Sequence, residues 1–413
     1  MANTFKFGNG EWAVGKETAL AYNDENSNFK PLPFTFDRAS TATVVNKQGL
    51  IETVGIDEPR IDFLNNTKGH LLLEPERRNI VTDSEALTYF SSQKDSTTLS
   101  VSITNPKGES GAIKYIPDSG TGGNRSISKN LTGLSGLHTQ SVFAKKDELR
   151  YLFLRLRNAP TRMAVFDLQD GVISDFNINV PKIENYGNGW YRCSATFDPS
   201  SSDTAGQLVF SFSADNTGSL TGEFDGDGTS GLFLWGAQIE AGSYATSYIP
   251  TQGEINGVTR SGELDFERED MVDLNLYSSE MTWFYDINLF YREAGTTVAP
   301  RLINTSNGQV FIGVNTPQST NTDLRIRHKN GTTALNTSAV TFTNGGRFKV
   351  AVKITGTTGT AYINGTNVGT FTTLAASNYD KYENTQNNSN NINDMRFYNT
   401  ALSDSELATL TTL

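Results

Sequence analysis

Hydrophobic and polar residues alternate in short runs along most of the chain, and turns rich in glycine and asparagine separate the runs. Leu99–Ile103, Leu324–His328 and Phe348–Ile354 are examples of such runs. An alternation with a period of two is typical of strands that bury one face in a core. We therefore predict an all-β protein made of short strands.

Local signals place two hairpins and one helix. Thr43–Val45 and Leu50–Val54 flank a turn at Gly49, and Asn364-Gly365 separates two further apolar segments. Asn-Gly between apolar runs is a strong signal for a two-residue hairpin turn. Ser403 is followed three residues later by Glu406, which is the pattern of a capping box. A short C-terminal helix is therefore expected.

The runs group into three regions. Residues 1–83 form an N-terminal β region rich in aromatic residues and glycine. Residues 84–252 hold about eight expected strands, a number typical of a jelly-roll-like sandwich. A charged linker then leads to residues 263–413, a second sandwich that ends in the predicted helix.

Composition excludes several classes of protein. The net charge is −11, so we expect no binding to the phosphates of nucleic acids. No apolar stretch is long enough to span a membrane, and residues 1–5 do not resemble a secretory signal. The single cysteine, Cys193, excludes an intramolecular disulfide. An extracellular-looking protein without an export signal fits a protein that is assembled in a bacterial cytoplasm and released when the cell is lysed.

Four segments of the first region, taken in order, resemble the recurrent opening of phage and prophage structural proteins. They are Phe36–Thr43, Gly49–Ile51, Glu58–Phe63 and Leu72–Ile80. The resemblance implies a structural protein of a bacteriophage particle, with the N-terminal region attached to other virion proteins. Because virion fibres and spikes are often trimers, it also implies a homotrimer.

Motifs in the other two regions resemble carbohydrate-binding folds. Gly187–Ser194 and Gly228–Thr251 are similar to a carbohydrate-binding-module-like sandwich. Met281–Trp283, Tyr362–Gly365 and Met395–Asp404 are similar to concanavalin A-like, laminin-G-type sandwiches. The turns of the third region hold few acidic residues, which does not favour a calcium-dependent sugar site. The resemblance implies adhesion to glycans on the host cell surface.

Candidates for catalysis are few. The three histidines, His70, His138 and His328, lie in no metalloprotease spacing, and there is no Gly-x-Ser-x-Gly elbow. A glycosidase needs only two carboxyl groups at a suitable separation. The candidates by residue type are Glu74 with Glu76, and a linker group made of Glu267, Glu269 and Asp270. Neighbours in sequence rarely form such pairs, so we predict that the protein is not an enzyme.

Sugar recognition uses an aromatic ring against the apolar face of a sugar, with polar side chains on its hydroxyls. Tyr244 and Tyr248 follow the last strand of the second region, and we expect them to be exposed. Trp190 and Trp235 lie in strands, where we expect core positions, as for Cys193. The polar segment 378–384 is the best candidate for a recognition loop. Its candidate ligand-binding residues are Tyr379, Asp380, Tyr382 and Asn384.

One glycine-rich turn has the spacing of a cation loop. Asp225 and Asp227 stand two residues apart, but the further ligands of an EF-hand are missing. The expectation is therefore no cofactor, with calcium at these two residues as the alternative.

The sequence thus predicts a non-enzymatic head or tail fibre, or spike, at the surface of a phage particle, which binds host glycans. Two alternatives stay open: a capsid decoration protein without a ligand, and a glycan-cleaving depolymerase.

Overall fold

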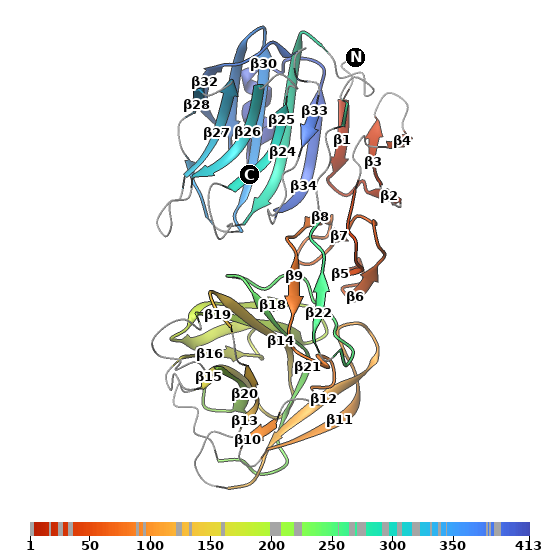
Figure 1. Cartoon of the computed structure of the whole chain (residues 1–413), viewed down its shortest axis with the longest axis vertical. Coiled ribbons are helices and arrows are strands. Elements are labelled where there is room, and N and C mark those ends of the chain that lie inside the picture. The colour runs from red at the N-terminus through yellow and green to blue at the C-terminus, as the bar shows by residue number, and fades with distance from the viewer. Residues whose placement is uncertain are drawn as a thin grey trace. The chain divides into compact units, whose positions relative to one another are not determined.

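The fold was obtained as a computed structural model, and it confirms the all-β class. The described residues are 4–15, 18–23, 28–31, 36–87, 91–93, 96–120, 126–131, 134–157, 162–198, 208–218, 225–254, 256–263, 269–270, 278–290, 297–303, 308–315, 323–330, 333–337, 340–343, 345–376, 379, 381–383 and 390–413. Within them the chain forms 34 strands and one helix (Figure 1). None of the helical structure in this part is long and apolar enough to cross a membrane.

The chain divides into two compact units. Unit 1 consists of Met1–Lys47, Thr53–Glu76 and Ser261–Leu413. Unit 2 consists of Gln48–Glu52 and Arg77–Arg260. Each unit contains two large sheets that face each other across a core.

Unit 2 is built from two six-stranded antiparallel sheets. The β15 sheet has the order β10 (Ser91–Gln93), β13 (Ser126–Leu131), β20 (Leu208–Asp215), β15 (Tyr151–Arg157), β16 (Arg162–Asp167) and β17 (Val172–Phe176). The β14 sheet has the order β11 (Ser96–Thr104), β12 (Ser110–Pro117), β21 (Leu232–Ala241), β14 (His138–Lys146), β19 (Trp190–Phe197) and β18 (Asn179–Asn185). A small sheet pairs β9 (Arg77–Asn79) with β22 (Val258–Arg260).

The core of unit 2 lies between its two sheets. Leu152 and Leu154 of β15 pack in one cluster with Val142 and Ala144 of β14. These residues occupy every second position of their strands, so the period-two pattern of the sequence is the pattern of burial. The predicted sandwich of the second region is confirmed.

Unit 1 contains an eleven-stranded sheet. Its main path is β2 (Ala13–Gly15), β3 (Thr18–Asn23), β1 (Thr4–Gly8), β34 (Asn390–Tyr398), β24 (Glu280–Leu289), β30 (Arg347–Thr355), β31 (Thr358–Ile363) and β32 (Thr366–Thr372). Off this path, β4 (Asn28–Pro31) pairs with β3, and β8 (His70–Leu73) pairs with β34 and with β7 (Ile61–Asp62).

A seven-stranded sheet forms the other layer of unit 1. Its order is β23 (Glu269–Asp270), β33 (Lys381–Glu383), β25 (Thr297–Ile303), β26 (Gly308–Asn315), β27 (Asp323–Asn330) and β28 (Thr333–Asn336), with β29 (Val340–Thr341) on β27. Trp283 and Val350 of the eleven-stranded sheet share one core cluster with Val310 and Ile326 of the seven-stranded sheet. This second sandwich is also confirmed.

Strands from both ends of the sequence pair in unit 1. In β1, Phe5 stands opposite Phe397 of β34, and in β8, Leu72 stands opposite Asn391 of the same strand (Figure 1). The eleven-stranded sheet therefore contains residues of the region 1–83 together with residues of the region 263–413.

The predicted local elements are confirmed. The hairpin strands β5 (Ala42–Val45) and β6 (Ile51–Val54) form a two-stranded sheet, and Gly49 between them has a φ of +79°. Asn364 and Gly365 join β31 to β32 with φ angles of 50° and 78°, the left-handed conformation that a type I′ turn needs. The helix α1 (Asp404–Thr411) begins at Ser403 with the complete capping box.

Candidate functional site

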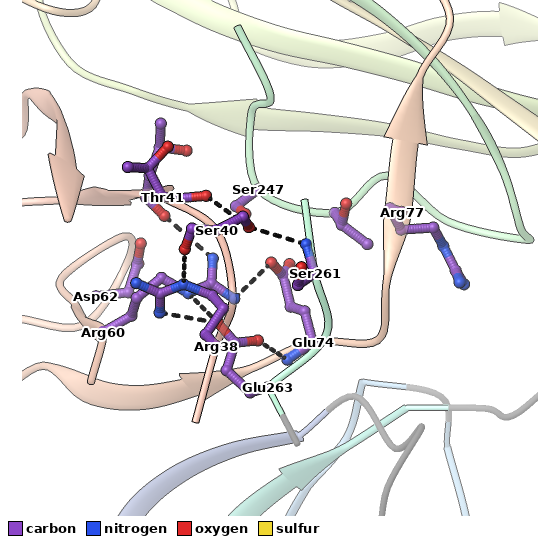
Figure 2. A network of polar contacts seen from close by, with 12 residues as sticks. Arg38, Ser40, Thr41, Arg60, Asp62, Glu74, Arg77, Ser247, Ser261 and Glu263 are labelled. Atoms are coloured by element: carbon purple, nitrogen blue, oxygen red, sulfur yellow. Dashed lines mark hydrogen bonds and ion pairs between the residues drawn. The ribbon is translucent and has the colours of Figure 1, made fainter. Parts of the chain in front are cut away.

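The motifs of the first region supply a buried ionic network in unit 1. Figure 2 shows the side chains of Arg38, Arg60, Glu74 and Glu263 converging. The Nε atom of Arg60 donates to Oε1 of Glu263 at 2.6 Å, and Nη2 of Arg60 lies 2.9 Å from Oε2 of Glu74. Nη1 of Arg38 contacts the same Glu263 oxygen at 3.3 Å. Both arginines are 0% exposed, so the network is closed to solvent.

Backbone groups bind the remaining positions of the network. Arg38 donates from Nε to the carbonyl of Ser40 at 2.8 Å and from Nη1 to the carbonyl of Glu58 at 2.9 Å. Arg60 donates to the carbonyl of Thr43 at 3.1 Å. The backbone N–H of Glu74 donates to Oε2 of Glu263 at 2.8 Å, so both carboxylate oxygens of Glu263 are used. The arginines therefore tie several motif segments to one carboxylate.

The charges of this network balance. Two guanidinium groups face two carboxylates, which offsets the large penalty of burying each ion alone. Burial lowers the pKa of Arg60, but the attraction of Glu263 and Glu74 raises it above its ordinary value. Arg60 is therefore positively charged at neutral pH.

Two further titratable groups lie beside the ion pairs. Asp62 accepts the N–H groups of Val45 and Leu64, both at 2.8 Å. Burial nevertheless raises the pKa of Asp62 to about 6. Burial also lowers the pKa of His70 to about 4, and its Nε2 lies 3.9 Å from Oδ1 of Asp62. His70 is therefore neutral at pH 7.

The environment of Glu74 does not suit acid–base catalysis. Its carboxylate is buried against Arg60, whereas Glu76 is exposed. The pair proposed from sequence proximity thus occupies two different environments. Of the linker acids, Glu269 and Asp270 form β23, and Glu267 lies outside the described residues.

A second carboxylate pair was not found from the sequence. Asp286 of β24 and Asp394 of β34 stand directly opposite each other in the eleven-stranded sheet. Arg347 donates from Nε to Asp286 at 2.7 Å, and Arg396 donates from Nε to Asp394 at 3.0 Å. Burial raises the pKa of Asp394, and the contact with Arg396 opposes this effect. Each carboxylate has its own arginine, which is an arrangement of structural ion pairs.

The prediction that Tyr248 is exposed is wrong. Tyr248 is 2% exposed, and its hydroxyl lies 2.7 Å from the hydroxyl of Ser84. Its ring packs 4.8 Å from that of Trp235 and 5.7 Å from that of Phe143. The segment after β21 thus folds back over the outer face of the β14 sheet, and the Tyr248 ring presents no face to a ligand.

Tyr244 is half-buried and keeps part of its surface exposed. The guanidinium of Arg77 lies 5.8 Å from the centre of its ring. The Nε of Arg77 lies 3.9 Å from Glu240, a buried carboxylate that also accepts the Thr246 hydroxyl at 2.6 Å. A cation therefore stacks on one face of Tyr244. Sugar binding at this ring stays a prediction.

The candidate recognition loop is only partly described. Tyr379 is 2% exposed, and its hydroxyl contacts the hydroxyl of Thr373 and accepts the N–H of Leu374. Tyr379 is thus a buried residue, and ligand binding at this position stays a prediction. Tyr382 lies in β33 opposite Leu302, whereas Asp380 and Asn384 lie outside the described residues. Ligand binding at these last three residues stays untested.

The glycine-rich turn with two aspartates uses one of them internally. Asp227 accepts the N–H groups of Thr229 at 2.8 Å and Ser230 at 2.7 Å, which is an Asx turn. The Ser230 hydroxyl donates to the other oxygen of Asp227 at 2.5 Å, and this bond together with the two N–H bonds holds the pKa of Asp227 well below its ordinary value. Asp225 is exposed. The part of the chain that is described contains no cluster of three acidic, histidine or cysteine side chains that could hold a metal ion.

Residues expected in the cores are found there. Trp190 and Trp235 are 1% and 0% exposed, and Cys193 is completely buried, which raises the pKa of its thiol. All three histidines are buried, and two of them stack on phenylalanine rings: His138 on Phe197 and His328 on Phe371.

Comparisons with known proteins find limited similarity. No family model and no curated protein matches the chain. Among solved structures, the CBM40 module of a Ruminococcus gnavus sialidase, bound to α2,3-sialyllactose, has 14% identity and a TM-score of 0.29 and covers 36% of this chain and 92% of that one. The binding domain of botulinum neurotoxin DC with SialylT has 15% identity and a TM-score of 0.28, with coverages of 38% and 39%. A pentraxin from Limulus polyphemus has 14% identity and a TM-score of 0.27, with coverages of 32% and 69%. At these values the likenesses identify neither a family nor a ligand for this chain.

Proposed function

We propose that this chain is a non-enzymatic structural protein at the surface of a bacteriophage particle. In this proposal it is a head or tail fibre, or a spike, that adheres to glycans of the host surface. The motifs of the first region, which resemble virion proteins, and the presence of two β-sandwiches support this role. The proposal includes assembly as a homotrimer and contacts with other virion proteins.

The observation that supports the non-enzymatic part of the proposal is that the charged side chains of the motifs are buried in ion pairs. Arg38, Arg60 and Glu74 come from the phage-like motifs, and all three belong to the buried network around Glu263. A catalytic carboxyl group must reach its substrate and exchange a proton with it. Glu74 is instead buried, with its Oε2 2.9 Å from Nη2 of Arg60, so the motif stabilises the fold.

A binding assay with the full chain tests the adhesive role. The purified protein is incubated with intact host cells, and in parallel with an array of bacterial surface glycans. Saturable binding that free glycan displaces is expected. The absence of binding to all cells and glycans would instead favour the decoration protein without a ligand.

A degradation assay tests the alternative of a depolymerase. The protein is incubated with host polysaccharide, and the products are analysed by size-exclusion chromatography. We expect no shortening of the polymer. Shortening that disappears in a single carboxylate variant, with Glu74→Gln and Glu269→Gln among those tried, would contradict the non-enzymatic assignment.

The oligomeric state is tested separately. Sedimentation equilibrium of the full chain is expected to give about three times the mass of one chain, 45.2 kDa. A concentration-independent mass of one chain would contradict the trimer and leave the binding proposal standing.

A further inference from the structure

The triplet Gly-Asn-Gly occurs twice in the sequence, at Gly8–Gly10 in unit 1 and at Gly187–Gly189 in unit 2. Asn9 and Asn188 have φ angles of 54° and 51°, and the glycines that follow them have φ angles of 95° and 79°. Two successive residues with positive φ are typical of a type I′ turn. The two turns share their local sequence and their backbone form, so a difference in their reactivity must come from their surroundings.

Contacts with other segments of unit 1 hold the turn at Asn9. The Nζ atom of Lys68 donates to Oδ1 of Asn9 at 2.7 Å. The backbone N–H of Asn9 donates to the carbonyl of Asn393 at 2.7 Å. The side-chain carbonyl of Asn9 therefore has a donor that fixes its orientation.

The Asn364-Gly365 turn has the same pattern of φ angles and is bound at both of its central residues. The N–H of Lys349 donates to Oδ1 of Asn364 at 2.9 Å. The N–H of Gly365 donates to Oγ1 of Thr411, a residue of α1, at 3.1 Å. The amide of this asparagine and the N–H of the following glycine are thus both engaged.

The turn at Asn188 has neither kind of contact. Its ends are fixed, because the N–H of Trp190 donates to the carbonyl of Gly187 at 2.8 Å. Asn188 and Gly189 are exposed. Within the part of the chain that the structure describes, no hydrogen bond is made by the side chain of Asn188 or by the N–H of Gly189. No bond therefore has to break before the Asn188 amide approaches this N–H.

An asparagine that is followed by glycine reacts with its own backbone. Hydroxide removes the N–H proton of the glycine, and the nitrogen attacks Cγ of the asparagine. The new N–Cγ bond forms, the Cγ–Nδ2 bond breaks, and the amide nitrogen takes up a proton from water and leaves as ammonia. Water then opens the resulting succinimide ring at one of its two carbonyl groups, which yields aspartate or isoaspartate. Glycine favours the attack because it has no Cβ in the way.

We propose that Asn188 is a site of spontaneous deamidation in the folded protein, and that hydrogen bonds protect Asn9 and Asn364 from the same reaction. The reaction needs only water and hydroxide, so it is independent of the proposed adhesion. Either product places a negative charge at the tip of the hairpin formed by β18 and β19. Isoaspartate also lengthens the main chain by one atom, which should disrupt the bond that closes this turn.

Mass spectrometry of the full chain tests the inference. The folded protein is kept in mildly alkaline buffer, samples are digested with pepsin at acidic pH, and the deamidated fraction is measured at Asn9, Asn188 and Asn364. We expect Asn188 to react about tenfold faster than the other two, which is the ratio expected when a hydrogen bond of typical strength must open first. In protein unfolded by urea, Asn9 and Asn188 should react at equal rates, because their triplets are identical.

A variant tests the protection directly. Lys68→Met removes the donor to Asn9 and keeps the length of the side chain, so Asn9 should react faster in the folded variant while Asn188 reacts at its former rate. The matched control is Lys353→Met, which removes a lysine that pairs with Asp404 and should change neither rate. Circular dichroism confirms that both variants are folded.

The outcomes decide between local protection and sequence alone. Equal rates at Asn9 and Asn188 in the folded protein would overturn the inference, and so would a faster reaction at Asn364. An Asn188 that stays intact in the folded protein, while the urea-unfolded protein reacts fully, would overturn it as well. If Lys68→Met left the rate at Asn9 unchanged, the protective role of that hydrogen bond would be refuted.

Discussion

The buried network around Glu263 provides the sharpest test of the structure. In Glu263→Gln, the side chain keeps its size but loses its charge. The two guanidinium groups of Arg60 and Arg38 then face only one carboxylate, that of Glu74. The amide NH₂ of the new side chain also takes the place of one oxygen of Glu263, either the one that accepts from Arg60 at 2.6 Å or the one that accepts from the N–H of Glu74 at 2.8 Å. The change therefore leaves an unbalanced cation in a site closed to water.

The size of the effect follows from this geometry. Removing one partner of a buried ion pair costs about 3–5 kcal/mol, because the remaining charge is not solvated. With a urea m-value of about 2–3 kcal/mol/M, the midpoint for unfolding of unit 1 should fall by about 1–2 M. The matched control is Glu11→Gln, at an exposed position of the same unit, which should change stability by less than about 0.5 kcal/mol.

The assay is urea unfolding at pH 7, followed by tryptophan fluorescence. The two units can unfold in separate transitions, so the transition of unit 1 must be identified. Trp283 reports on unit 1 because it lies in the core of that unit, whereas Trp190 and Trp235 belong to unit 2. A double variant with Arg60→Gln restores the balance of one cation and one anion, so it should lose less stability than the sum of the single variants. A loss below about 1 kcal/mol in Glu263→Gln, or strict additivity in the double variant, would refute the reasoning.

Three other predictions follow from single contacts. Between pH 6.5 and 4, His70 is protonated more readily in the unfolded chain than in the folded one, so its titration lowers the stability of the fold as the pH falls. Asp62 has the opposite effect between about pH 6 and 4, because it takes up its proton more readily in the folded chain. Asp62→Asn should therefore make the melting temperature fall more steeply in this range, and an unchanged slope would argue against the raised pKa of Asp62. Ser403→Ala removes the capping box of α1 and should cost about 1 kcal/mol of unfolding free energy in denaturant titrations, with Ser405→Ala as the control. The buried thiol of Cys193 should react with a thiol reagent only after urea is added, and fast reaction of the folded protein would show that β19 is wrongly placed.

Local features of the fold could be predicted from the sequence because a few neighbouring residues determine them. The Asn364-Gly365 turn and the Ser403 cap depend on backbone conformations that these residue types favour, and both are present. Trp190 and Trp235 were also placed correctly, since a large aromatic residue within an alternating strand is stabilised by burial.

Contacts between distant segments could not be predicted. Arg60 and Glu263 are 203 residues apart, and no local pattern relates them. Asp286 and Asp394 meet only because β24 and β34 are neighbours in a particular register. Tyr248 follows the last strand of its sandwich, and its burial depends on a segment that turns back over the sheet, which alternation within strands does not indicate.

The sequence order of unit 1 has a consequence for synthesis on the ribosome. Strands β1 and β8 emerge early, yet their partner β34 begins at Asn390, after all of unit 2 has been made. A nascent chain can thus complete the middle of the protein while its first strands still lack a partner. Shortening the gene before codon 390 should therefore yield a chain that folds in part and aggregates through unpaired strand edges.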